Sequence, residues 1–103
     1  MASRTETFTA LVAQQPENEL FRFSLAQALV TDGRGAEAVA HFEYCVAKKV
    51  DWMMPRILLG KLFVQLIRRS DAKAQFADAL RLAVEQNHED PERELRALLA
   101  ELV

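Results

Sequence analysis

Glycine and proline are scarce in this chain of 103 residues, which contains only three of each. These two residues oppose helix formation most strongly, and the good helix formers Ala, Leu, Glu, Arg, Lys, Gln and Met make up most of the rest. An all-α fold is therefore the first expectation. Cysteine occurs once, as Cys45, so no internal disulfide can form, and the first residues do not resemble a secretory signal. The expected location is the cytoplasm.

A strong charge of one sign is also missing. Thirteen Lys and Arg residues stand against fifteen Asp and Glu residues, and the basic doublets Lys48-Lys49 and Arg68-Arg69 lie at predicted helix ends, where cations complement the helix dipole. The longest near-apolar run, 57–67, is interrupted and is shorter than the roughly 20 residues that span a bilayer. The composition predicts one soluble, compact domain with neither a nucleic-acid partner nor a membrane segment.

What the sequence does contain is an internal repeat. A shift of 34 positions superposes three copies of one helix, aligned as Phe8 with Phe42 and Phe76, Leu11 with Cys45 and Ala79, and Val12 with Val46 and Leu80. It also superposes two copies of a second helix, aligned as Leu25 with Leu59, Ala26 with Gly60, and Leu29 with Phe63. The repeat predicts about six helices in one domain over 1–103: a half repeat over 4–15, helix pairs over 19–49 and 52–86, and a last helix over 91–102.

Local signals support these boundaries. Ser3 and Glu6 have capping-box spacing, Pro91 suits a first helical position, and Gly33 can adopt the left-handed conformation that ends a helix. The remaining candidate N-caps are Asn18, Asp51, Ser70 and Asp90. The last helix matches the earlier ones only with a shift of 36, so the loop over 87–90 is expected to be about two residues longer than its predecessor. Because the connections are short, neighbouring helices are expected to run antiparallel.

The repeat resembles the tetratricopeptide repeat (TPR), which carries Trp-x2-Leu-Gly-x2-Tyr, then Ala-x3-Phe, then Pro. The matching residues are Leu25, Ala26, Leu29, Ala38 and Phe42 in the first repeat and Leu59, Gly60, Phe63, Ala72 and Phe76 in the second. Arg22 and Pro55 stand in place of the large aromatic residue, and Val50 and Val84 in place of the proline. The resemblance implies a right-handed superhelix of antiparallel helical hairpins, a TPR-like α-solenoid, with Phe42 and Phe76 between successive hairpins. A regular helical bundle is the alternative.

The last predicted helix is expected to cap this array. Each solenoid repeat contacts only its neighbours, so the second helix of the final pair needs a cover. An apolar stripe on the last helix can cover it, and comprises Leu95, Leu98, Leu99 and Leu102.

Candidate catalytic and metal sites are few. His41 follows Glu37 by four residues, but no second ligand lies at a usable spacing. Cys45 falls at a small apolar position of the repeat and is expected to be packed and inert, and His88 is expected to be a solvated loop residue. Glycine-rich phosphate loops, nucleophilic serine motifs and catalytic carboxylate pairs are not recognisable. We therefore expect no enzyme activity, no cofactor and no bound metal.

The most informative surface is the expected inner face of the first helix in each pair. Residues at helical spacing form two apolar stripes, Leu20, Phe23, Gln27 and Val30 on one helix and Met54, Ile57, Lys61 and Val64 on the next. In the TPR family this face forms a concave groove for an extended or helical peptide, so the resemblance implies a protein or peptide partner, with Phe23, Met54 and Ile57 as anchors. The family's clamp for acidic chaperone tails is absent, because Phe23, Gln27, Leu58 and Lys61 occupy its places.

Two interpretations of the stripes stay open. In the first, the chain is a non-catalytic interaction module, an adaptor whose apolar groove takes a partner peptide or amphipathic helix. In the second, the apolar surface is covered within the protein itself, either by the last helix or by a twin chain. Cover by a twin chain would make the protein a structural self-assembly unit, a symmetric homodimer.

Overall fold

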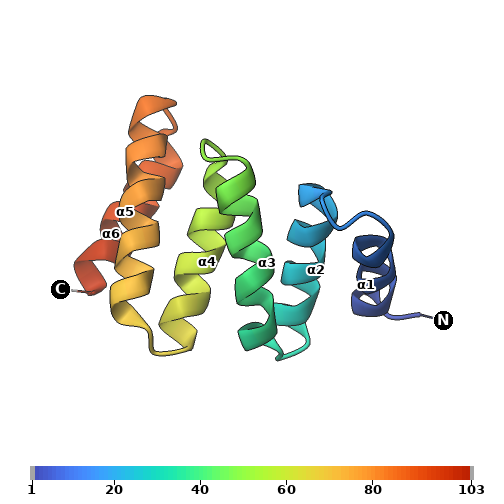
Figure 1. Cartoon of the computed structure of the whole chain (residues 1–103). Coiled ribbons are helices and arrows are strands. Elements are labelled where there is room, and N and C mark those ends of the chain that lie inside the picture. Colours follow the sequence, from blue (N-terminus) through green and yellow to red (C-terminus); the bar gives the residue numbers. More distant parts are fainter. Residues whose placement is uncertain (1, 103) are drawn as a thin grey trace. The chain divides into compact units, whose positions relative to one another are not determined.

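The computed structural model describes residues 2–102, and within that range the chain forms α-helices and no strand (Figure 1). The helices are α1 (Arg4–Gln14), α2 (Glu19–Thr31), α3 (Gly35–Lys48), α4 (Met53–Gln65), α5 (Arg69–Glu85) and α6 (Glu89–Glu101). The all-α fold with six helices is therefore confirmed for the described residues. Contacts divide the helices into two compact units, one with α1, α2 and α3 that ends at Val50 and one with α4, α5 and α6 that begins at Asp51. The assignment of 1–103 to a single domain stays a prediction.

Each unit is built from helices that are neighbours in the sequence. In the first unit α1 packs on α2 and α2 on α3, and in the second α4 packs on α5 and α5 on α6. The repeat positions supply the buried residues of both hairpins: Leu25, Ala26, Leu29, Ala38, Phe42 and Cys45 in the first, and Leu59, Gly60, Phe63, Ala72, Phe76 and Ala79 in the second. The repeat pattern thus marks positions that are removed from water.

Phe42 and Phe76 are buried, as expected, and each ring contacts the other helix of its own hairpin. A Cβ atom built at Gly60 would lie within 3.0 Å of three ring atoms of Phe76, so the ring rests on the backbone of α4. The ring of Phe42 meets that of Phe23 edge-on, with centroids 6.1 Å apart and planes at 70°. These contacts join the two helices of one hairpin, and the expected position of both rings between successive hairpins stays a prediction.

Three helices end in the same turn. After α2, α4 and α5, the second residue beyond the helix has a left-handed backbone: Gly33 (φ 77°), Ile67 (φ 59°) and Asn87 (φ 58°). The Gly33 N–H donates to the Val30 carbonyl at 3.0 Å, and the Arg34 N–H donates to the Leu29 carbonyl at 2.8 Å. The turns at Ile67 and Asn87 contain the same pair of backbone hydrogen bonds, which satisfies carbonyls that a helix end leaves without partners. The helix-ending role predicted for Gly33 is confirmed.

Side-chain caps occur at the first two helices. The Ser3 hydroxyl accepts from the Glu6 N–H at 3.1 Å, and the Asn18 side chain accepts from the N–H groups of Leu20 and Phe21 at 3.0 and 3.1 Å. These two predicted N-caps are confirmed.

The later predicted caps are wrong. Each turn starts the next helix two residues after its left-handed residue, so α5 begins at Arg69 and α6 at Glu89. Ser70 and Asp90 therefore lie inside helices, Pro91 is the third residue of α6, and Trp52 rather than Asp51 precedes α4. The two additional residues of the last repeat lengthen α5 instead of the following loop.

An arginine occupies the same position in the first helix of each hairpin. Arg22 and Arg56 are exactly one repeat apart, so Arg56, and not Pro55, stands at the place of the family's aromatic residue. The Arg22 guanidinium lies 4.3 Å from the ring centroid of Tyr44, and Arg56 Nη1 lies 3.3 Å from Asp78 Oδ2. Tyr44 and Asp78 are also separated by one repeat, so both arginines contact the same position of the second helix.

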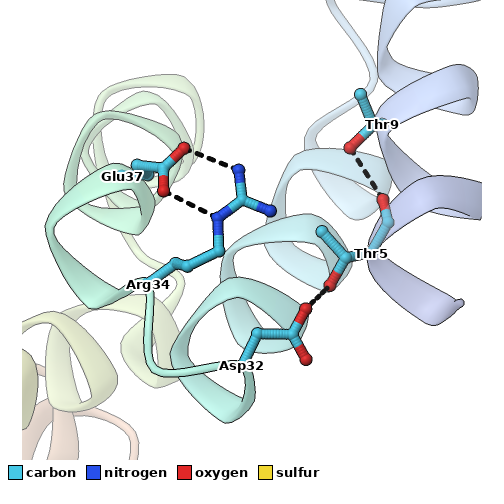
Figure 2. Close-up of polar contacts among 5 residues, drawn as sticks. All are labelled: Thr5, Thr9, Asp32, Arg34 and Glu37. Atoms are coloured by element: carbon cyan, nitrogen blue, oxygen red, sulfur yellow. Dashed lines mark hydrogen bonds and ion pairs between the residues drawn. The ribbon is translucent and has the colours of Figure 1, made fainter.

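A polar cluster joins α1 to the end of α2 (Figure 2). The Thr5 hydroxyl, which is buried, donates to Asp32 Oδ2 at 2.5 Å, and the Thr9 hydroxyl donates to the Thr5 carbonyl at 2.7 Å. Beside it, Arg34 forms a two-pronged ion pair with Glu37, with distances of 2.7 and 2.8 Å. This ion pair lowers the pKa of the Glu37 carboxyl.

The last helix covers α5 as expected. Leu95 is fully buried, while Leu98, Leu99 and Leu102 are half-buried. Four charged residues of α6 are exposed, namely Arg93, Glu94, Arg96 and Glu101, and Glu92 is half-buried. The amphipathic pattern of α6 therefore matches a terminal cover over the final pair.

Candidate protein-interaction surface

The predicted stripe on α2 is only partly accessible to a partner. Leu20 is 56% exposed at the beginning of the helix, whereas Phe23, Gln27 and Val30 are half-buried. The edge contact with Phe42 holds the Phe23 ring in place. Because side chains on a packed helix have few alternative rotamers, a partner that binds here would meet a surface that is already ordered.

The predicted stripe on α4 is divided between core and surface. Met54 is 50% exposed and Val64 is also exposed, but Ile57 is only 6% exposed and offers a partner almost no surface. Lys61 Nζ lies 3.3 Å from Glu94 Oε1, so an ion pair joins α4 to α6 on this unit. Both side chains of the pair are about half exposed, and surface pairs of this kind contribute little to stability.

The side chains with possible chemistry are not arranged as a reactive site. Cys45 is buried, its thiol donates to the Glu19 carbonyl at 3.4 Å, and burial raises its pKa to about 11, so the reactive thiolate is disfavoured. Burial and then the charge of Arg22 lower the pKa of His41. His88 precedes α6 without a side-chain cap. Among residues 2–102, no three His, Cys, Asp or Glu side chains gather closely enough to hold a metal ion.

Carboxylates accompany both basic doublets. Lys49 Nζ lies 3.0 Å from Glu19 Oε1, and Arg68 Nε lies 2.8 Å from Asp71 Oδ2. These contacts reduce the positive charge that either doublet could present to a phosphate backbone. None of the described helices combines the length and the apolar character needed to cross a bilayer.

One exposed residue was missed by the sequence interpretation. Ile67 is 84% exposed and has a left-handed backbone, which is an outlier for a β-branched residue. The available signal was the repeat itself, because Ile67 lies one repeat after Gly33 and therefore at the position of a helix-ending glycine. The position of Arg56 in the repeat was also missed, because the sequence interpretation assigned the family's aromatic position to Pro55, one residue too early.

No protein-family model and no curated protein sequence matches this chain. Solved structures do. PcrH in complex with the chaperone-binding region of PopD is 19% identical with a TM-score of 0.86, over 95% of this chain and 74% of PcrH. The Yersinia enterocolitica type III secretion translocator chaperone SycD is 13% identical with a TM-score of 0.87, over 95% of this chain and 68% of SycD. A tetratricopeptide repeat domain protein from Salinibacter ruber is 28% identical with a TM-score of 0.76, over 85% and 89% of the two chains.

These similarities establish a TPR-like helical-repeat fold for the chain. Two of the similar proteins are chaperones by their descriptions, and one of them was solved with a bound region of another protein. A fold alone does not specify the partner, the residues that bind it or the pathway.

Proposed function

We propose that this chain is a non-catalytic interaction module that binds an amphipathic helix or extended peptide of a partner protein through the stripes on α2 and α4. The observation that carries the proposal is the exposure of Leu20, Met54 and Val64 at positions that the repeat assigns to one face of equivalent helices. The exposed part of a large apolar side chain does not stabilise the folded chain, and it provides binding energy when a partner covers it. PcrH, which has the same fold, was captured with a segment of PopD.

The accessible anchors in this proposal differ from those inferred from the sequence. Met54 keeps its role, and Phe23 contributes the part of its ring that remains exposed. Ile57 is buried, so it supports the helix position rather than contacting the partner. Leu20 takes the place of the third anchor, since anchors need both apolar area and access.

A defined peptide library tests the proposal. Random peptides of about 16 residues, enough for four helical turns, are displayed on phage and selected on the folded protein. Recovered peptides are synthesised with a fluorescent label, and their affinity is measured by anisotropy. Leu20→Asp and Met54→Asp should each weaken binding at least tenfold, because a buried unpaired carboxylate opposes association.

Val84→Asp is the matched control. Val84 is 47% exposed on α5 but lies outside both stripes, so the same substitution there should leave peptide affinity unchanged. The assignment of the stripes would be contradicted if all three variants lost peptide affinity equally while circular dichroism showed that they were folded.

The alternative proposal is a homodimer that covers the same apolar residues. Light scattering over a range of concentrations separates the interaction module from the homodimer. Only self-assembly gives an average molecular mass that rises with protein concentration, and that mass should return to the monomer value in Leu20→Asp and Met54→Asp. The cytoplasmic location stays a prediction that cell fractionation can test.

A further inference from the structure

The two end helices correspond to the two halves of one repeat. α1 is equivalent to α3 and α5, the second helices of the hairpins, because Phe8 aligns with Phe42 and Phe76. α6 is equivalent to the first helix α4, because a shift of 36 places Leu95 on Leu59. In residues 2–102, α1 packs mainly on α2, and α6 packs mainly on α5. Each end helix therefore lacks the partner with which its counterparts form a hairpin.

Burial shows the consequence for α1. Phe42 is 1% exposed and Phe76 is fully buried, whereas the equivalent Phe8 is half-buried. Cys45 is fully buried, whereas the equivalent Leu11 is half-buried. Apolar surface that a hairpin would bury thus stays partly in water on α1.

Each helix of a complete hairpin has a small residue at one position of the repeat. First helices have Ala26 or Gly60 there, second helices have Ala38 or Ala72, and all four residues are buried. At Gly60 the contact is direct, because a Cβ atom there would lie within 3.0 Å of three ring atoms of Phe76. Interiors are close-packed, so a long side chain at these positions would hold the paired helices apart.

Both end helices have arginine at this position. Arg4 on α1 aligns with Ala72, and Arg96 on α6 aligns with Gly60 by the same shift of 36. Both arginines are exposed. The two helix faces that lack a partner are therefore the two that have a long cationic side chain in place of a small residue.

The present contacts of these arginines are compatible only with unpaired faces. The Arg4 guanidinium lies 5.7 Å from the ring centroid of Phe8, over the ring that a first helix would cover. Arg96 Nε lies 3.1 Å from Glu92 Oε2 on the surface of α6. If α6 of one copy met α1 of another as a hairpin, the junction would enclose two positive charges that are now hydrated, at a large cost in desolvation and repulsion.

We propose that Arg4 and Arg96 prevent copies of this chain from stacking end to end, by blocking the junction in which α6 of one copy and α1 of the next complete a repeat. A second copy is the partner that fits both faces, because one copy supplies the first helix of a hairpin and the other supplies the second. Such a junction is head to tail and leaves a free α1 and a free α6, so without the arginines it would extend into a filament. The inference is independent of the stripes on α2 and α4.

The variant Arg4→Ala, Arg96→Ala tests the proposal, since alanine occupies these positions in α2, α3 and α5. Its average molecular mass by light scattering should rise with protein concentration and exceed that of the original chain at least twofold at about 1 mM. Each single variant should keep the mass of the original chain, because every junction then still contains one arginine. An equimolar mixture of the single variants permits one kind of junction, so it should form pairs of chains and nothing longer.

Two further variants are controls. Arg4→Lys, Arg96→Lys retains a long cationic side chain at both positions and should keep the mass of the original chain. Arg4→Ala, Arg81→Ala also removes two exposed arginines, but Arg81 lies on α5 and leaves the face of α6 blocked. This variant should keep the original mass too. Circular dichroism verifies that all variants are folded.

Three results would overturn the proposal. The arginines block nothing if folded Arg4→Ala, Arg96→Ala has the mass of the original chain at every concentration. Removal of charge in general, rather than a specific junction, is the cause of assembly if the Arg81 control assembles equally. The junction is not head to tail if the mixture of single variants forms species longer than two chains.

Discussion

The left-handed Ile67 is the residue at which this chain departs furthest from what its backbone favours. Replacing it by glycine should raise the free energy of unfolding by about 1 kcal/mol, because relief of about 1–2 kcal/mol of strain exceeds the added freedom of the unfolded chain. Urea titration measures the change. Asn87→Gly is the control and should have a smaller effect, since asparagine already tolerates this conformation. A loss of stability in Ile67→Gly would mean that the side chain has packing that its exposure does not reveal.

Cys45 makes stability depend on pH in the alkaline range. Its pKa is raised from 9.0 to about 11 by burial, so the folded chain holds the thiol proton more tightly than the unfolded chain does. This contribution is complete below about pH 9 and is lost as the pH rises through about 11. The urea midpoint should therefore fall more between about pH 8 and about pH 10.5 in the original chain than in Cys45→Ala.

Alanine is the matched replacement because Ala79 occupies the equivalent position of α5. If the urea midpoint falls equally with pH in the original chain and in Cys45→Ala, groups other than Cys45 cause the alkaline loss of stability. Thiol labelling at neutral pH offers a second check, since a buried thiol with a raised pKa should react only as the chain unfolds.

At the scale of helices, the approach of α4 to α5 depends on the absence of a side chain at Gly60. Gly60→Ala should lower the free energy of unfolding by about 1–3 kcal/mol, because the new methyl group overlaps the ring of Phe76. A double-mutant cycle with Phe76→Leu checks the cause. The cost of Gly60→Ala should shrink in the Phe76→Leu background, where the facing side chain is smaller and more flexible. If the losses of unfolding free energy from Gly60→Ala and Phe76→Leu are additive, the cost of Gly60→Ala does not come from contact with Phe76.

The helices and their pairing could be predicted from the sequence because the repeat is a pattern of burial. Leu25 and Leu59, or Phe42 and Phe76, recur once in every repeat since each must occupy the same place in a hairpin, and that requirement is visible in residue type. The caps at Ser3 and Asn18 could be predicted for a different reason. Their hydrogen bonds are local, to N–H groups two or three residues away.

The later helix starts could not be predicted from residue type, because backbone turns set them. Ser70 and Asp90 have the side chains of N-caps, yet the turns at Ile67 and Asn87 begin the next helices earlier. The candidate site shows the same limit. Helical spacing places Ile57 on the stripe with Met54, but spacing alone does not tell which residue lies at the edge of the core.

At the scale of the whole chain, α6 is expected to be required for folding rather than to be an optional arm. Ending the chain at His88 removes Leu95 and uncovers the face of α5 that α6 packs against. The truncated protein should lose its cooperative thermal transition by circular dichroism and should aggregate in light scattering. Leu98→Ala in the full chain is the control, because Leu98 is only half-buried and its truncation should leave the transition cooperative. A cooperative melt of the truncated chain, together with loss of a dimer, would instead identify α6 as an arm exchanged between copies.

The packing of each helix on its neighbours in the sequence also bears on how fast the chain folds. Within each unit, α1 meets α2, α2 meets α3, α4 meets α5 and α5 meets α6, so the loops that must close are short. Low contact order of this kind places folding in the microsecond-to-millisecond range, and no slow search for distant strands is needed. The same local construction lets an end helix open without the rest. Amide hydrogens of α1, whose apolar residues Phe8, Leu11 and Val12 are only half-buried, should exchange with solvent well before those of α4.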